Sequence, residues 1–414
     1  MIEVKEQAKR GKEAWQLCKA EASVRNQVLL RAAEQIDEQR EAIKEANAKD
    51  LTKARQSGLS AAMQDRLKLT ERRIDGMISG LREVAEAEDP SGKILWTREL
   101  PNGLRLQRVT VPLGLIGIIY EARPNVTVEA SSLIFKAGNA VLLRGGSAAR
   151  ESNLILTSCL QDALEAEGLP KELIQLLDDP SREGSKAMMH CHEWLDVLIP
   201  RGGKALIREV TEHATVPVIR TGEGNCHIYL DEGADLKQAL EIVVNAKMQR
   251  PSVCNAAETL LVHEKEAEAF LPALEAAIGR DCELRADAAA LKILGKGAEP
   301  ASEADYATEY NDYILAIRIV PSLDAAISHI RRYGTMHSEA ILTQDKERSE
   351  RFLNEVDAAA VYLNASTRFT DGGEFGFGGE LGISTQKLHA RGPMGLEALV
   401  SYKYKIYGDG QVRA

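Results

Sequence analysis

The chain reads Met248-Gln249-Arg250-Pro251-Ser252-Val253-Cys254-Asn255-Ala256-Ala257-Glu258-Thr259 where an expected helix gives way to an expected strand. Apolar residues recur at helical spacing from Leu236 to Ala246, and an apolar run from Thr259 to Val262 follows the turn. A nucleophile at such a junction is held rigidly and stays open to substrate. Cys254 is therefore the first candidate for chemistry.

Cys254 has two interpretations at this point. A thiolate forms near neutral pH only where positive charge or free backbone N–H groups stabilise it, and Arg250 and the turn can supply these. A free cysteine is also commonly a small buried hydrophobe. The local pattern leaves both interpretations open.

Length and composition indicate a large globular chain of two or three domains. The chain has 414 residues, of which 44% are hydrophobic. Its net charge of −10 and the lack of a basic stripe disfavour binding to nucleic acid. An anionic small substrate needs only local arginines, so the net charge does not exclude one.

The cysteine pattern and the N-terminus indicate a cytoplasmic protein. Six cysteines are scattered without a CxxC pair, which is typical of free thiols in a reducing compartment. We expect no metal, because the His190–Glu193 cluster has no matching second cluster. No apolar run has the length of a signal peptide or of the ~20 residues that span a membrane.

The chain begins with helices and continues into a hairpin. Residues 3–89 have helical periodicity with a break at 58–60, and 65–88 is expected to be one amphipathic helix. Residues 94–111 alternate with period two around the turn 101–103. Because an isolated hairpin is only marginally stable, we expect it to pack on a distant segment or another subunit.

Two α/β units are expected after the hairpin. In the first, strands at 115–120, 140–143, 173–177, 195–199 and 216–219 alternate with helices at 126–137, 150–167, 181–190 and 204–212. This rhythm predicts a parallel sheet with helices on both faces. The second unit runs from 227 to 364, with strands at 259–263, 314–320, 339–343 and 360–363. A glycine-rich tail then leads to a strand-like segment at 399–407.

Two Arg-Gly-Gly turns follow strands of the first unit, at 144–147 and 201–204. Paired glycines let a backbone approach a phosphate, and a helix N-terminus offers N–H groups and positive potential. Each turn alone is as consistent with an ordinary strand-to-helix connection, but two in one sheet favour a dinucleotide. Asn125, after Arg123-Pro124, could donate to an oxyanion or serve as a turn former.

Taken together, these motifs resemble the aldehyde dehydrogenase superfamily over nearly the whole chain and in the same order. The blocks that carry the resemblance are 120–127, 136–141, 144–146, 200–203, 249–256, 374–385 and 389–396. The resemblance implies an α/β fold with a Rossmann-type cofactor domain, an α/β catalytic domain and a small β oligomerisation ribbon. The implied bounds are 1–93 with 112–226 and part of 365–390, then 227–364, and finally 94–111 with 391–414.

The resemblance narrows to the branch that reduces L-glutamyl 5-phosphate to L-glutamate 5-semialdehyde for proline biosynthesis. It implies that Cys254 is the nucleophile and that Asn125 belongs to the oxyanion hole. The implied cofactor residues are Arg144, Gly145, Gly146, Ser147, Arg201, Gly202, Gly203 and Glu309. Ser147 stands where relatives that prefer NAD carry an acidic residue, and Arg144 would attract a 2′-phosphate, so the expected cofactor is NADPH.

Two departures from hydrolytic aldehyde dehydrogenases indicate that water is not the second substrate. Residues 221–226 have no clean equivalent of the general-base glutamate. The helix after Asn125 is also expected to be shorter by about one turn. An NAD-dependent hydrolytic enzyme remains the alternative. A non-catalytic binding protein and a cysteine acyl hydrolase are weaker rivals, the second because it needs a histidine near Cys254.

The substrate carries anionic groups, for which Arg123, Arg250, Ser366 and Arg368 are the candidate ligands. The hairpin and the terminal strand resemble the ribbon that joins subunits in this superfamily, which implies at least a dimer. A transient contact with glutamate 5-kinase, which makes the labile acyl phosphate, is a further hypothesis.

Overall fold

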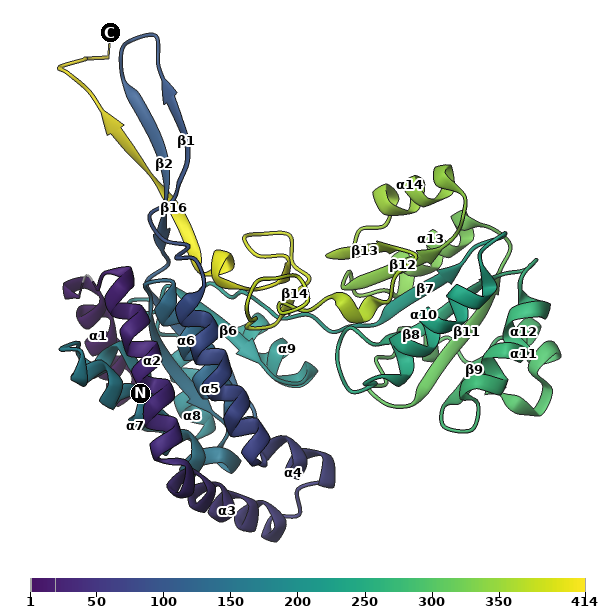
Figure 1. Ribbon diagram of the computed structural model, residues 1–414, viewed down its shortest axis with the longest axis horizontal. Helices are drawn as coiled ribbons and strands as arrows, with labels where there is room; N and C mark the ends of the chain where they lie inside the picture. Colours follow the sequence, from purple (N-terminus) through teal and green to yellow (C-terminus); the bar gives the residue numbers. More distant parts are fainter. Residues whose placement is uncertain (1, 19, 414) are drawn as a thin grey trace. The chain divides into compact units, whose positions relative to one another are not determined.

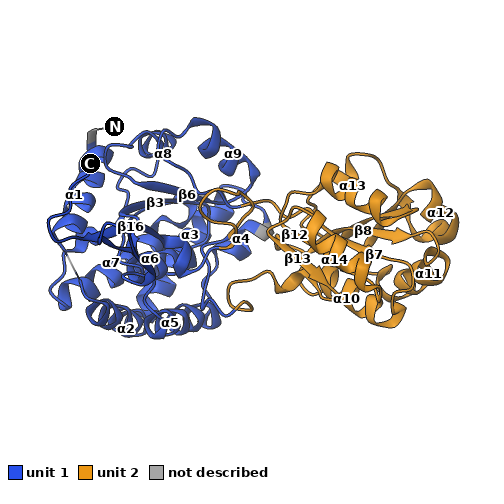
Figure 2. Cartoon of the chain, turned by 90° about the horizontal axis from the view of Figure 1, so that it is seen from above, with its two compact units in different colours: residues 1–221, 376–382, 394–414 blue, residues 222–375, 383–393 orange. Residues whose placement is uncertain are grey.

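The computed structural model describes residues 2–18 and 20–413, and the chain divides into two compact units (Figure 2). Unit 1 comprises Met1–Thr221, Gly376–Gly382 and Met394–Ala414. Unit 2 comprises Gly222–Phe375 and Ile383–Pro393. The short 3-10 turns of the two units are Ser147–Ala149, Lys171–Leu173, Gly295–Gly297, Asp305–Ala307, Thr367–Phe369 and Leu396–Leu399.

Unit 1 opens with a helical region, as the periodicity predicted, and its described residues form five helices there. They are α1 (Ile2–Leu17), α2 (Ala22–Glu38), α3 (Arg40–Gln56), α4 (Ala61–Leu67) and α5 (Glu71–Glu86). The expectation of a single helix over 65–88 was wrong, because the chain breaks between α4 and α5. The Asn47 side chain of α3 binds the Leu67 carbonyl and the Leu69 N–H, and Thr70 caps α5.

A four-stranded parallel sheet forms the centre of unit 1, in the order β5-β4-β3-β6. The elements are β3 (Leu115–Tyr120), α6 (Asn125–Lys136), β4 (Ala140–Gly145), α7 (Arg150–Ala166), β5 (Ile174–Leu176), α8 (Arg182–Met189), β6 (Val197–Arg201) and α9 (Lys204–His213). Helices cover both faces, as expected. A Cβ at Gly117 would meet Met188 of α8, whereas Tyr120, on the opposite face of the same strand, binds Thr127 of α6.

The strand expected at 216–219 does not form. Only an isolated bridge joins Leu198 to Val218. Pro217 has no N–H to donate, so the backbone there offers only the two bonds that Leu198 makes with Pro217 and Ile219.

An antiparallel ribbon of three strands extends from unit 1 (Figure 1). Its strands are β1 (Ile94–Glu99), β2 (Arg105–Pro112) and β16 (Val400–Tyr407), with β2 in the centre. The predicted hairpin is confirmed, and Gly103 takes the positive φ (82°) that its turn requires. The terminal strand pairs with β2 over its whole length, so the distant partner of the hairpin is the C-terminal segment.

A seven-stranded parallel sheet forms unit 2, in the order β10-β9-β11-β8-β7-β12-β13. Its strands are β7 (Cys226–Leu230), β8 (Ala257–His263), β9 (Glu283–Ala286), β10 (Glu299–Pro300), β11 (Ile314–Val320), β12 (Ser338–Leu342) and β13 (Ala360–Leu363). The four strands predicted for this unit are confirmed, whereas β7, β9 and β10 were not predicted. A two-stranded ladder, β14 (Ile383–Ser384) with β15 (Gly392–Pro393), lies in the tail.

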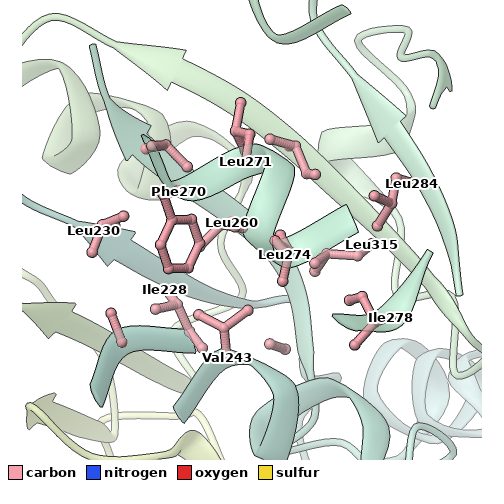
Figure 3. Packing of buried hydrophobic residues seen from close by; sticks show 14 of the residues in the cluster. Ile228, Leu230, Val243, Leu260, Phe270, Leu271, Leu274, Ile278, Leu284 and Leu315 are labelled. Atoms are coloured by element: carbon pink, nitrogen blue, oxygen red, sulfur yellow. The ribbon is translucent and has the colours of Figure 1, made fainter. Parts of the chain in front are cut away.

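Helices pack on both faces of the second sheet. They are α10 (Leu236–Met248), α11 (Ala267–Ile278), α12 (Ala288–Leu294), α13 (Leu323–Tyr333) and α14 (Lys346–Glu355). The larger core holds Phe270 of α11 over Ile228 and Leu260 of the sheet (Figure 3). A second cluster packs α13 and α14 on the other face, with Phe352 fully buried. Among the described residues, no helix combines the length and apolarity needed to cross a membrane.

Candidate active site

The cysteine turn of unit 2 connects α10 to β8 as the sequence predicted. Cys254 is partly exposed, whereas Cys159, Cys191, Cys226 and Cys282 are buried. Burial raises the pKa of the Cys159 thiol to about 12 and that of Cys282 to about 11. These buried thiols are therefore poor nucleophiles, and the accessibility of Cys254 favours the reactive interpretation over the buried one.

The backbone around Cys254 is fixed by close contacts within unit 2. A Cβ at Gly224 would lie 1.4 Å from the carbonyl oxygen of Cys254, so only glycine allows this approach. The buried thiol of Cys226 donates to the same carbonyl at 3.2 Å. The next residue, Asn255, donates to the carbonyls of Arg368 and Thr370. The turn is therefore anchored on both sides of the nucleophile candidate.

Two of the predicted substrate arginines come together beside this turn. Nε of Arg368 donates to Oε1 of Gln249 at 2.9 Å. Burial and the charge of Arg250 lower the pKa of Arg368. Arg368 is partly exposed and Arg250 is exposed, and two neighbouring cations favour an anionic ligand. Ser366 is buried and its hydroxyl accepts from the Arg368 N–H, so the structure uses it to shape the arginine turn.

Glu309 lies on the segment after the 3-10 turn at Asp305–Ala307. Its Oε1 accepts a hydrogen bond from the Gly224 N–H at 2.9 Å. This contact places the carboxylate next to the residue that packs on the Cys254 carbonyl. The assignment of Glu309 to a cofactor ribose stays a prediction.

The two Arg-Gly-Gly turns of unit 1 lie at one edge of the first sheet. The register pairs Tyr120 with Gly145 on one side and with Arg201 on the other. The ends of β3, β4 and β6 therefore face the same side, which is where parallel sheets bind nucleotides.

In the first of these turns, close packing requires glycine at position 145, and the Arg144 side chain is available for a ligand. A Cβ at Gly145 would lie 2.1 Å from the Asn153 side chain and 2.9 Å from the Tyr120 hydroxyl. Nη2 of Arg144 donates to the carbonyls of Pro180 and Ser181, while its buried Nε has no partner. Burial lowers the pKa of Arg144. Ser147 is exposed at the start of the following 3-10 turn.

The second turn carries a contact that sequence reasoning missed. Gly203 caps α9, and its N–H donates to Oε2 of Glu121 at 2.9 Å. Gly202 packs on the same side chain, since a Cβ there would lie 2.8 Å from the Glu121 carboxyl carbon. This N–H group, which we expected to meet a phosphate, is thus bound to the chain's own carboxylate. The signal available was Glu121 itself, directly after a strand at the same sheet edge.

Asn125 is the first residue of α6 in unit 1. Its Nδ2 donates to Oε1 of Glu129, one helical turn further on, at 2.8 Å. Arg123 precedes it and is half-buried. Their predicted roles toward Cys254, which belongs to unit 2, stay predictions.

Comparisons with known proteins agree with these motifs. The model of the aldehyde dehydrogenase family matches residues 2–284. A gamma-glutamyl phosphate reductase of Moorella thermoacetica is 55% identical, covering 100% of this chain and 99% of its own length. The enzyme of the same name from Enterococcus faecalis is 57% identical, with 94% of each chain covered.

Solved structures give the same picture. The crystal structure of gamma-glutamyl phosphate reductase from Thermotoga maritima is 47% identical, covers 100% of both chains and has a TM-score of 0.96. An acetylating aldehyde dehydrogenase from Geobacillus thermoglucosidasius has a TM-score of 0.70 at 17% identity, covering 100% of this chain and 98% of its own. At that identity the second likeness bears on the fold alone.

Proposed function

The chain belongs to the aldehyde dehydrogenase family, and on that premise we propose that it reduces L-glutamyl 5-phosphate to L-glutamate 5-semialdehyde, releasing phosphate, in L-proline biosynthesis. The names of full-length relatives at 55% and 47% identity support this substrate. The observation that carries the proposal is the accessible Cys254 beside two arginines, Arg250 and Arg368, which suit an acyl phosphate that also bears a carboxylate.

The proposed chemistry begins with the Cys254 thiolate. It attacks the acyl carbon, the carbon–oxygen bond to phosphate breaks, and phosphate leaves with that bond's electron pair. A thioester on Cys254 remains. Asn125 and the Cys254 backbone N–H stabilise the tetrahedral oxyanion. When bound, NADPH would supply the hydride that reduces the thioester. The resulting thiohemiacetal collapses, which releases the aldehyde and restores the thiolate.

This scheme needs no residue to activate water. Phosphate is the leaving group in one direction and the attacking group in the other. The absence of a clean general-base glutamate from 221–226 is consistent with that scheme. The hydrolytic, NAD-dependent alternative requires such a base and is less well supported.

Members of this family use nicotinamide cofactors, and we infer that this chain prefers NADPH. The residues at the end of β4 fit a 2′-phosphate: Arg144 has an unpartnered Nε, and Ser147 adds no negative charge. In this assignment Gly145, Gly146 and the turn 201–203 complete the cofactor surface of unit 1. Glu309 holds the nicotinamide ribose, Arg123 completes the substrate surface, and buried Ser366 contributes by shaping the turn that carries Arg368.

Replacing Arg144 by alanine is expected to weaken NADPH binding by about tenfold to a hundredfold, since a hydrogen bond to a charged group contributes about 1.5–3 kcal/mol. NADH lacks the 2′-phosphate, so its binding should change little. Titration of the purified protein with each cofactor, followed by nicotinamide fluorescence, measures both constants. Equal losses for the two cofactors would assign Arg144 to the fold and remove the reason for the NADPH preference.

We also infer that the ribbon joins subunits, at least as a dimer. Its exposed apolar side chains, Ile94, Leu95, Tyr404 and Ile406, are each 50–60% exposed. Both outer strands, β1 and β16, have open edges within unit 1.

A transient contact with glutamate 5-kinase would shorten the path of the labile acyl phosphate.

The substrate assignment is tested by coupling the protein to glutamate 5-kinase, ATP and glutamate, which produces the acyl phosphate in place. NADPH absorbance should fall only when all components are present. Steady absorbance with active kinase would contradict the assignment.

A further inference from the structure

A fully buried ion pair joins the two ends of the cysteine turn. Lys247 is the penultimate residue of α10, and Glu258 is the second residue of β8. Both side chains are 0% exposed, and Nζ lies 2.6 Å from Oε2. The ten residues between them include Cys254. Desolvating two charges cancels much of their attraction, so such a pair is weak evidence for stability and better evidence for a required geometry.

The second oxygen of Glu258 reaches the segment that carries Glu309. Its Oε1 accepts from the Asn311 N–H at 3.0 Å. Asn311 has a φ of 55°, a left-handed conformation that asparagine tolerates better than most residues. Tyr310 stands between Glu309 and Asn311 in the sequence. Its ring lies 5.9 Å from the Lys247 ammonium, and its hydroxyl donates to Asp305 at 2.9 Å.

These contacts form a closed network around Cys254, the nucleophile candidate. Oε1 of Glu309 accepts from the Gly224 N–H at 2.9 Å, and Gly224 packs directly on the Cys254 carbonyl. The network thus connects the ends of the cysteine turn, through Glu258, to the 309–311 segment, and that segment in turn contacts the cysteine turn. All of its members belong to unit 2.

We propose that Lys247 and Glu258 are positioning residues that hold the Cys254 turn and the Glu309 carboxylate in one fixed relation. The part that concerns Glu309 rests on the proposed function, because that function assigns Glu309 to the cofactor. Hydride transfer to a thioester on Cys254 depends on such a relation, since a misplacement of about 1 Å can cost about a hundredfold in rate.

The two residues act as one unit electrically. Burial raises the pKa of Glu258 to about 7, and Lys247 is the main influence that opposes this rise. Without the lysine, the carboxyl would be largely neutral at neutral pH. Lys247→Met and Glu258→Gln should therefore lower kcat by similar factors, and kcat of the double variant should fall little further than in either.

The test compares Lys247→Met, Glu258→Gln and the double variant. Each single variant leaves one buried group without its partner, so Tm should fall. In the double variant, glutamine still accepts from Asn311 and no charge remains buried, so Tm should recover. The exposed pair Arg351→Met/Glu355→Gln is the matched control, and it should leave every measurement unchanged.

Three readouts separate positioning from stability. The first is the alkylation rate of Cys254 by iodoacetamide, followed by mass spectrometry of its peptide, which should change at least threefold in all three variants. The second is kcat, which should fall by about tenfold or more even where Tm recovers. The kinetic isotope effect with NADPH deuterated at the transferred position should rise, because hydride transfer becomes slower.

Recovery of kcat together with Tm in the double variant would overturn the proposal and leave the pair a structural role. Unchanged alkylation of Cys254 would overturn it as well. Alkylation does not require turnover. If the unmodified protein fails to reduce the acyl phosphate while alkylation still responds to the variants, the function assignment fails and the positioning of Cys254 stands.

Discussion

Replacement of Cys254 by alanine is expected to lower turnover of the acyl phosphate by about 10⁴-fold or more, because removing the nucleophile of a covalent mechanism removes the step that all others follow. The side chain is partly exposed, and its loss leaves no large cavity. Tm should therefore stay close to that of the unmodified protein. NADPH consumption with the kinase-coupled substrate measures the effect.

Cys18→Ala is the matched control for that experiment. Cys18 is the other partly exposed cysteine among the described residues, and it belongs to unit 1. Its removal should leave kcat unchanged. Activity that survives in Cys254→Ala, or that disappears in Cys18→Ala, would contradict the assignment of the nucleophile.

Replacement of Asn125 by alanine is expected to slow turnover by about a hundredfold or more, since loss of one oxyanion donor costs about 3 kcal/mol of barrier. KM should change much less than kcat, because the interaction forms in the transition state. Asn125→Asp should be as slow, since a carboxylate accepts hydrogen bonds and would repel the oxyanion. Steady-state kinetics of both variants give the comparison.

The structure supplies a control for the amide of Asn125. Its Nδ2 donates to Glu129 within α6, so it must exchange this partner to meet an oxyanion. Glu129→Ala removes the helix contact and keeps the amide. It should retain turnover close to that of the unmodified protein. Near-normal kcat in Asn125→Ala would refute its role, and an equal loss in Glu129→Ala would indicate that only the helix terminus matters.

Most of the fold follows from local periodicity. The apolar run before His263 and the amphipathic pattern of α10 place the cysteine turn correctly. The predictions that failed depend on contacts between residues that lie far apart in the sequence. The break between α4 and α5 depends on Asn47, which reaches across from another helix. The strand β10 has two exposed residues and exists only because β9 pairs with it.

Some residues of the candidate site could likewise be predicted from the sequence, and others could not. Cys254 is a candidate because of its place in a short turn of small residues, but only the resemblance of the surrounding motifs to the aldehyde dehydrogenase superfamily favoured a nucleophile over a buried thiol. The contact of Glu121 with Gly203 and the buried pair of Lys247 with Glu258 involve ordinary charged residues. Nothing in their local sequence separates them from solvated surface charges. Only the packing of the strands reveals that these side chains are turned inward or capped onto a helix.

The central claim is that phosphate, rather than water, resolves the thioester on Cys254. The most direct measurement is NADP-dependent oxidation of glutamate 5-semialdehyde with and without inorganic phosphate. The claim predicts NADPH production that rises with phosphate and is absent without it. NADPH production that is indifferent to phosphate would contradict the claim, because water would then be the acyl acceptor and a base for it would have to exist.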